Sequence, residues 1–218
     1  MKPIKAIFFD LDGTLLDTIE DLKTAVNYAM DSFGFPHRTY DEIRCFVGNG
    51  MQNLINRSLP VDVSDSSIQK QALDIFLDYY GAHLIDFTKP YSGVVELMTK
   101  LKDLGYIVAI VSNKEDLSAR KVCRHFFHTI PDYVIGESDE LARKPAPDMI
   151  KYLLSSFKLK PDEVVLVGDS DVDAKTALNA KVPFVAVTWG FRTRRQLEEV
   201  GATLFINYPN ELLEVLNQ

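Results

Sequence analysis

Short, nearly unbroken apolar runs recur along the chain, with amphipathic stretches between them. The runs cover residues 4–9, 106–111, 133–135, 164–167, 184–187 and 204–206. IVAIV, VVLV and FVAV within them are entirely apolar, which indicates strands buried on both faces, as in a parallel sheet covered by helices. Alternation of such strands with helices predicts an α/β domain with a doubly wound parallel sheet.

Start and stop signals mark the helices between these strands. Ser92 can N-cap a helix that Gly105 ends, and Pro147 suits the first turn of a helix that runs to about residue 157. Thr193 can N-cap another helix that stops near Gly201.

The segment from residue 17 to residue 86 breaks the alternation, because it contains no convincing strand. Its apolar residues recur at helical spacing, and Thr39 followed by Glu42 forms a capping-box pattern. About seventy helical residues are too many for one crossover connection. We therefore expect a helical domain at 17–86, inserted into an α/β core domain made of residues 1–16 and 87–218.

Composition and charge narrow the function classes. The chain has 218 residues, is 46% hydrophobic and 25% charged, and has a net charge of -7, so we expect a folded protein with no nucleic-acid partner. No apolar run reaches the roughly 18 residues that span a membrane, and the N-terminus lacks a signal-peptide pattern. Two cysteines, Cys45 and Cys123, are too few for a disulfide framework. We expect a cytoplasmic monomer or homodimer with reduced thiols and no membrane partner.

Two carboxylates follow the first apolar run directly. Asp10 and Asp12 are two residues apart in an extended segment, so both point to the same side, and Gly13 permits an immediate turn. Such a pair suits Mg²⁺, which prefers oxygen ligands, although Asp residues in loops also cap backbone amides. A calcium-binding EF-hand is excluded, because Leu15 and Asp21 stand where Gly and Glu are required.

Polar residues also follow the next apolar runs. Ser112 and Asn113 can donate hydrogen bonds to an anion, or can N-cap the helix that begins near residue 115. Lys144 lies in a loop stiffened by Pro145 and Pro147, where it can bind phosphate as a point charge or remain a solvated surface lysine.

The fourth apolar run ends in a second acidic sequence, Gly-Asp-Ser-Asp-Val-Asp. Asp169 lies at the strand end, and Asp173 can also favour the N-terminus of the following helix. Ligands of open parallel sheets bind beyond the carboxyl ends of the strands. Acids, a serine and a lysine at several such ends together indicate metal-assisted handling of a phosphate group.

These motifs resemble those of the haloacid dehalogenase superfamily of phosphohydrolases. DLDGTLLDT from Asp10, VSNK from Val111, KPAPD from Lys144 and GDSDVD from Gly168 occur in the family's order and span nearly the whole chain. The helical insert resembles the family's helical cap. A dehalogenase is disfavoured, because those members replace the second motif aspartate and Asp12 is present here.

The resemblance implies a covalent mechanism with defined roles. Asp10 would attack phosphorus, and Asp12 would protonate the leaving oxygen and later activate water. Lys144 would steady Asp10 and the phosphate. The remaining implied roles are phosphate binding by Ser112 and Asn113, Mg²⁺ binding by Asp10, the Asp12 backbone carbonyl and Asp169, and support by Asp173.

The substrate implied by the resemblance is a small phosphate ester. Phe46-Val47-Gly48-Asn49-Gly50 resembles the bacterial phosphoglycolate phosphatase branch, so 2-phosphoglycolate is the first candidate, with Gly48, Asn49 and Gly50 as substrate-selecting residues; a plain helix–helix turn explains them equally well. Sugar-phosphate phosphatase, pyrophosphatase and phosphoglucomutase-type transfer remain alternatives. A phosphoaspartate signalling module is the non-enzyme alternative, although such modules lack a large helical insert.

Overall fold

The computed structural model describes residues 3–48 and 50–217. The chain divides into two compact units, one made of Met1–Asp17 and Pro90–Gln218 and the other of Thr18–Lys89. The sequence analysis placed the boundaries between the units after residues 16 and 86. In the structure they follow Asp17 and Lys89, which are one and three residues later.

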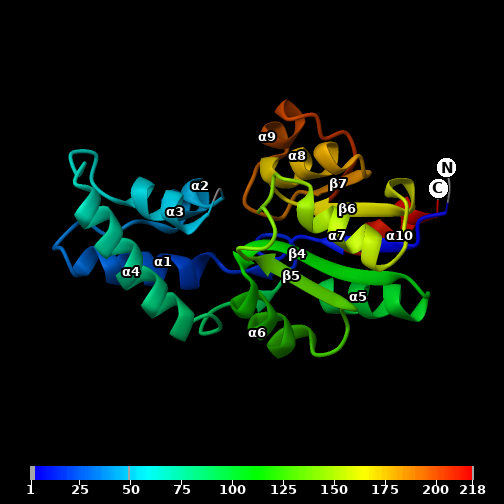
Figure 1. The fold of residues 1–218 in the computed structure, drawn as a ribbon, viewed down its shortest axis with the longest axis horizontal. Helices are drawn as coiled ribbons and strands as arrows, with labels where there is room; N and C mark the ends of the chain where they lie inside the picture. Colours follow the sequence, from blue (N-terminus) through cyan, green and yellow to red (C-terminus); the bar gives the residue numbers. More distant parts are fainter. Residues whose placement is uncertain (1–2, 49, 218) are drawn as a thin grey trace. The chain divides into compact units, whose positions relative to one another are not determined.

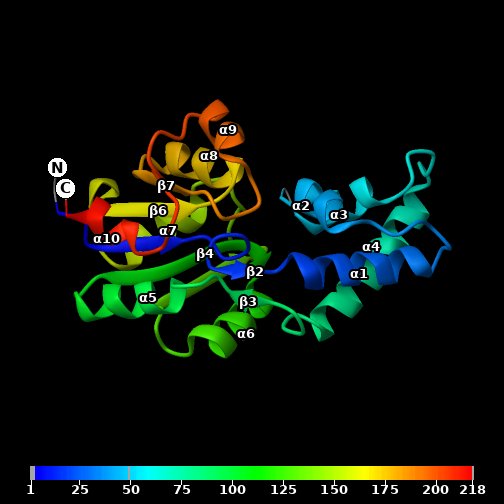
Figure 2. The ribbon, with the colours of Figure 1, turned by 180° about the vertical axis from the view of Figure 1, so that it is seen from behind.

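A six-stranded parallel sheet forms the centre of the discontinuous unit (Figures 1 and 2). The strand order is β5-β4-β1-β6-β7-β8, which confirms the predicted α/β fold. The strands are β1 (Ala6–Phe9), β4 (Ile107–Glu115), β5 (Tyr133–Glu137), β6 (Val164–Gly168), β7 (Phe184–Val187) and β8 (Phe205–Ile206). All six coincide with the predicted apolar runs. A separate two-stranded sheet pairs β2 (Leu16–Asp17) with β3 (Lys89–Pro90).

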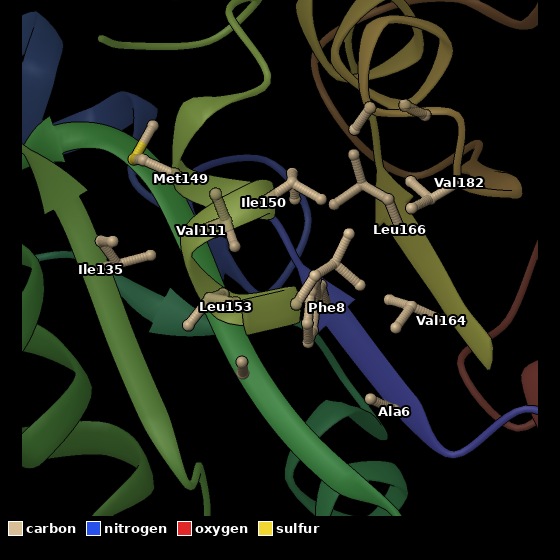
Figure 3. Packing of buried hydrophobic residues seen from close by; sticks show 14 residues of the cluster. Ala6, Phe8, Val111, Ile135, Met149, Ile150, Leu153, Val164, Leu166 and Val182 are labelled. Carbon is tan, nitrogen blue, oxygen red and sulfur yellow. The ribbon is translucent and has the colours of Figure 1, made fainter. Parts of the chain in front are cut away.

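Strand β1 is buried on both faces, which explains its unbroken apolar sequence. Phe8 points into a cluster with Val111 and Leu166 from the neighbouring strands, and α7 (Asp148–Ser156) and α8 (Asp171–Ala180) cover this face (Figure 3). Ile7 alternates with Phe8 and therefore points to the other face. Figures 1 and 2 place α5 and α6 on that opposite side of the sheet.

Among the remaining helices of this unit, the local sequence signals predicted one N-cap correctly and one incorrectly. They are α5 (Val94–Asp103), α6 (Asp116–Phe127), α9 (Arg194–Glu199) and α10 (Glu211–Leu216), with a 3-10 turn at Pro161–Glu163. Thr193 caps α9 in a capping box with Gln196, as predicted. The Ser92 prediction was wrong by one residue, because Gly93 occupies the N-cap of α5 with φ 84°, a conformation that glycine adopts without steric cost.

The unit Thr18–Lys89 is helical. Its helices are α1 (Ile19–Asp31), α2 (Tyr40–Phe46), α3 (Met51–Ser58) and α4 (Ser66–Ala82), and α1 packs against α4. Thr39 and Glu42 form the predicted capping box at the start of α2. No specific pattern in the sequence predicted α3.

A buried carboxylate ties the two ends of the helical unit together. Asp21, in the first turn of α1, is 2% exposed. It accepts hydrogen bonds from the backbone N–H groups of Phe87 (2.9 Å) and Thr88 (2.8 Å). The outgoing helix and the returning chain are therefore joined at this point.

Neither cysteine forms a disulfide. Cys45 is exposed on α2 and Cys123 is buried on α6, and both are free, as predicted. Across the described residues, every helix is too short or too polar to cross a bilayer.

Candidate active site

The topology brings three polar strand ends to one place. β1 lies between β4 and β6 and pairs with both in parallel register. The residues that follow β1 and β6, and those at the end of β4, therefore meet at one edge of the sheet. Asp10 follows β1 and Asp169 follows β6.

Three buried carboxylates lie together at this edge, and two of them bind one ammonium group. Oxygens of Asp10, Asp169 and Asp173 lie within 4.8 Å of one another. The Nζ of Lys144 donates to Oδ1 of Asp10 at 2.7 Å and to Oδ1 of Asp173 at 2.7 Å. Lys144 is 3% exposed, so the interpretation as a solvated surface lysine was wrong. Its partners Asp10 and Asp173 are 134 and 29 residues away in the sequence, so the local sequence around Lys144 could not predict its burial.

Burial and the charge of Asp173 raise the pKa values of Asp10 and Asp169. Burial raises the pKa of Asp10 well above its usual value, the charge of Asp173 adds to the rise, and Lys144 opposes it. Burial, again with Asp173, raises the pKa of Asp169 to about 7, against the opposing hydrogen bond from the Phe191 N–H. Burial lowers the pKa of Lys144, but the neighbouring carboxylates outweigh it and the net shift is upward.

This arrangement fits a divalent cation. Three ionised carboxylates and one ammonium leave two uncompensated negative charges in a buried site, and Mg²⁺ prefers such oxygen ligands. Asp10 and Asp169 were both expected to bind the metal. The side chain of Asp12 is not part of this group, and the expected metal contact of its backbone carbonyl stays a prediction. Asp173 completes the group instead.

Asp173 has a supporting position as well as a place in the acidic group. Its Oδ1 accepts from Lys144, and its Oδ2 accepts from the Ser170 hydroxyl at 2.5 Å and the Ser170 N–H at 3.1 Å. Ser170 caps α8 in a capping box with Asp173. The helix-start interpretation of Asp173 is therefore confirmed, and its contact with Lys144 is the one that the implied supporting role requires.

Asp169 is held in a narrow space between two glycines. The Thr14 hydroxyl donates to its Oδ1 at 2.9 Å, and the Phe191 N–H donates to its Oδ2 at 2.7 Å. A Cβ on Gly13 would lie 2.5 Å from Oδ2 of Asp169, and a Cβ on Gly190 would lie 2.6 Å from its Cγ. Only glycine at both positions leaves room for this carboxylate.

Ser112 and Asn113 do not cap a helix. Strand β4 continues to Glu115, whose own side chain caps α6. The Ser112 Oγ accepts from the Lys114 N–H at 3.1 Å, so its hydroxyl hydrogen can still be donated elsewhere. Asn113 is bound at both ends of its amide to the backbone of Lys144, at 2.8 and 2.9 Å. Asn113 thus positions the lysine loop.

Asp12 faces a lysine that the sequence interpretation left without a role. The Lys114 Nζ lies 3.3 Å from both carboxylate oxygens of Asp12. Cys123 is close enough for both charges to act on its thiol, whose pKa is raised to about 12, chiefly by burial. No regular alternation could have signalled this contact, because the strand register shifts between Val111 and Glu115.

The predicted substrate-selecting segment joins two helices. Gly48 (φ 106°) follows α2, and Gly50 (φ 88°) is the N-cap of α3. Asn49 lies outside the described residues. The two glycines thus occupy the helix–helix connection that the alternative interpretation expected.

Comparison with known proteins identifies the family. The model of the haloacid dehalogenase-like hydrolase family matches residues 7–187. This chain belongs to the haloacid dehalogenase-like hydrolases. The assignment confirms the resemblance noted in the motifs and contradicts the signalling-module alternative.

The relatives of this hydrolase agree with the assignment over its full length. It is 34% identical to the phosphoglycolate phosphatase of Vibrio vulnificus strain YJ016, over 99% of this chain and 97% of that protein. A candidate phosphoglycolate phosphatase from Lactobacillus delbrueckii subsp. bulgaricus superposes with a TM-score of 0.92, at 31% identity and 98% coverage of both chains. A haloacid dehalogenase-like hydrolase from Streptococcus pneumoniae gives 0.89, at 27% identity and 99% coverage of both. The chain is therefore an enzyme of the phosphoric monoester hydrolase class.

Proposed function

We propose that this hydrolase is a Mg²⁺-dependent phosphatase of small phosphomonoesters and that 2-phosphoglycolate is its preferred substrate. The observation that carries the mechanism is the buried acidic group around Lys144, with Asp12 held separately beside it. The names of the full-length relatives support the substrate.

In the first step, a carboxylate oxygen of Asp10 attacks phosphorus and the bond to the ester oxygen breaks. Asp12 gives its proton to the departing oxygen, so the alcohol leaves neutral and Asp10 carries the phosphoryl group. Lys144, 2.7 Å from Asp10, fixes the direction of attack. Positioning and charge stabilisation are the main sources of catalysis in phosphoryl transfer.

In the second step, Asp12 accepts a proton from water as that water attacks the phosphorus. The bond between phosphorus and Asp10 breaks, and inorganic phosphate leaves. One group serves as acid and then as base, so the enzyme returns to its starting protonation state.

The other residues bind and balance charge. Ser112 donates its hydroxyl hydrogen to a phosphate oxygen, and Asn113 keeps Lys144 in place. Asp10, Asp169 and the Asp12 backbone carbonyl would hold Mg²⁺, which would supply positive charge to the phosphate and the acids. We assign substrate selection to the helical unit, as a cap domain, with Gly48 and Gly50 as candidates. The cytoplasmic location and the monomeric or dimeric state stay predictions.

The test is phosphate release from a panel of esters by the purified protein with Mg²⁺. The panel contains 2-phosphoglycolate, hexose phosphates, nucleoside monophosphates and pyrophosphate. We expect 2-phosphoglycolate to have the highest kcat/KM, and chelation of Mg²⁺ or the substitution Asp10→Asn to abolish release. Asp74→Asn is the matched control, because Asp74 pairs with Lys70 on the exposed surface of α4. A preferred hexose phosphate or pyrophosphate would replace the proposed substrate, and release that survives Asp10→Asn would overturn the mechanism.

A further inference from the structure

Lys114 is a buried lysine that the proposed chemistry does not yet use. Its side chain is 1% exposed and reaches the 17% exposed side chain of Asp12, 102 residues away in the chain. Its Nζ is equidistant, at 3.3 Å, from the two carboxylate oxygens. A buried ammonium is costly unless it is paired, so this contact offsets part of the cost of its burial.

A bulge in β4 directs Lys114 toward Asp12. Between the pairs Val111–Ile135 and Glu115–Glu137, β4 advances four residues while β5 advances two. The extra residues include Lys114. Bulges turn side chains away from the regular alternation of a strand and are frequent beside active sites.

The bulge is held rigidly from β5. A Cβ on Gly136 would lie 2.5 Å from the Lys114 carbonyl oxygen and 2.5 Å from the Asp116 Cα, so the two backbones approach more closely than any other residue permits. The Asp116 carboxylate accepts from the Gly136 N–H at 2.8 Å. Lys114 therefore extends from a fixed piece of backbone.

The two buried lysines divide the acids between them. Lys144 binds Asp10 and Asp173 of the metal-binding group, whereas Lys114 binds Asp12. Resting on the function proposed above, we propose that Lys114 is a positioning residue that holds the Asp12 carboxyl at the leaving-group oxygen and away from the acidic group.

The contact suits a group that both gives and takes a proton. A carboxylate can accept from Lys114 at either oxygen, and a protonated carboxyl still has its carbonyl oxygen as an acceptor. Lys114 can therefore hold Asp12 in both steps. Because misplacement by about 1 Å can cost roughly 100-fold in rate, loss of this hold should weaken proton delivery specifically.

The test compares two esters of similar shape that differ in their need for proton delivery. Phenol is the poorer leaving group, so phenyl phosphate depends on Asp12 more than p-nitrophenyl phosphate does. For Lys114→Met we expect kcat/KM to fall about 10–100-fold with phenyl phosphate and less than about 3-fold with p-nitrophenyl phosphate. A merely structural role would lower both equally. In the Asp12→Asn background, Lys114→Met should leave the ratio of the two values unchanged.

Three further variants keep the result interpretable. Lys102→Met removes another lysine–carboxylate pair, with Asp132, away from the site, and should leave the ratio at its wild-type value. Lys114→Arg keeps the charge and should restore the ratio to within about threefold of wild type. Lys114→Gln is measured with Lys114→Met and replaces it if the methionine variant does not fold.

An unchanged ratio in a folded Lys114→Met or Lys114→Gln variant overturns the proposal. So does a changed ratio that persists when Asp12→Asn is already present, because Lys114 would then act on another group. Failure of the proposed function gives a different result: the wild-type protein itself releases no phosphate from either ester or from 2-phosphoglycolate.

Discussion

Replacing Gly190 with alanine adds one methyl group against the most confined carboxylate of the site. The new Cβ would lie 2.6 Å from the Asp169 Cγ and 2.5 Å from the Gly13 carbonyl oxygen. Non-bonded carbon atoms prefer about 3.5–4.0 Å, so Asp169 would have to move by about 1 Å. Gly13 limits its movement on the other side, and the hydrogen bonds from Thr14 and Phe191, at 2.9 and 2.7 Å, would be lost or lengthened.

The expected cost follows from that displacement. Forcing a methyl group into a packed site costs about 1–3 kcal/mol, and about 2–4 °C of Tm corresponds to each kcal/mol in a domain of this size. We therefore expect Tm to fall by about 2–12 °C. A displaced metal ligand should weaken Mg²⁺ binding by about 10–100-fold, which removes about 1.4–2.7 kcal/mol of the Mg²⁺-induced stabilisation.

Thermal unfolding with and without Mg²⁺ measures both effects in one experiment. Gly81→Ala is the control, because Gly81 lies at the exposed end of α4 and an added Cβ would meet no atom within 4 Å. Its Tm should stay at or slightly above the wild-type value, with an unchanged response to Mg²⁺. If Gly190→Ala matches wild type in both Tm and Mg²⁺ response, the absence of a side chain at Gly190 does not determine the place of Asp169.

Two further predictions concern charge and the helical unit. The pKa of Asp169 is about 7 when folded and 3.8 when unfolded, so the metal-free protein should lose stability as pH rises from about 4 to 7, by up to about 1.4 kcal/mol per pH unit. Urea unfolding should show this slope, and Asp169→Asn should reduce it without removing it, because the raised pKa of Asp10 contributes a slope of the same sign. Stability that rises over this range would contradict the prediction. Asp21→Ala should lower the unfolding free energy by about 2–4 kcal/mol, because two buried N–H groups, of Phe87 and Thr88, lose a charged acceptor. The exposed Asp78→Ala should change it by less than about 0.5 kcal/mol, and equal losses would contradict the role of Asp21.

The sequence predicted the strands well because a strand buried on both faces has a continuous run of apolar residues. Ala6–Phe9 and Val164–Gly168 are apolar on both faces, which is typical of strands covered by helices on both sides. The capping boxes at Thr39 and Thr193 were equally visible, because both partners lie within three residues. Helix α3 was missed because its sequence, MQNLINRS, has too few apolar residues to show a period.

The site was predictable as a set of residues but not as a set of contacts. Asp10 and Lys144 are 134 residues apart, and Asn113 and Lys144 are 31 apart, so no spacing rule relates them. The two hydrogen bonds between the Asn113 amide and the Lys144 backbone depend on the bulge in β4, as does the pairing of Lys114 with Asp12. A bulge is set by how two strands pair, which a single strand's sequence does not contain.

The insertion of the helical unit after β1 has a consequence for synthesis at the ribosome. β1 is made first, yet its neighbours β4 and β6 begin only at Ile107 and Val164. During that interval the nascent chain carries an apolar strand with two open edges, while α1 to α4 can already form from local contacts. Such unpaired strands favour aggregation, so the emerging chain is vulnerable until its second half arrives. Because Asp10 and Asp169 meet only then, the acidic group forms among the last features of the molecule.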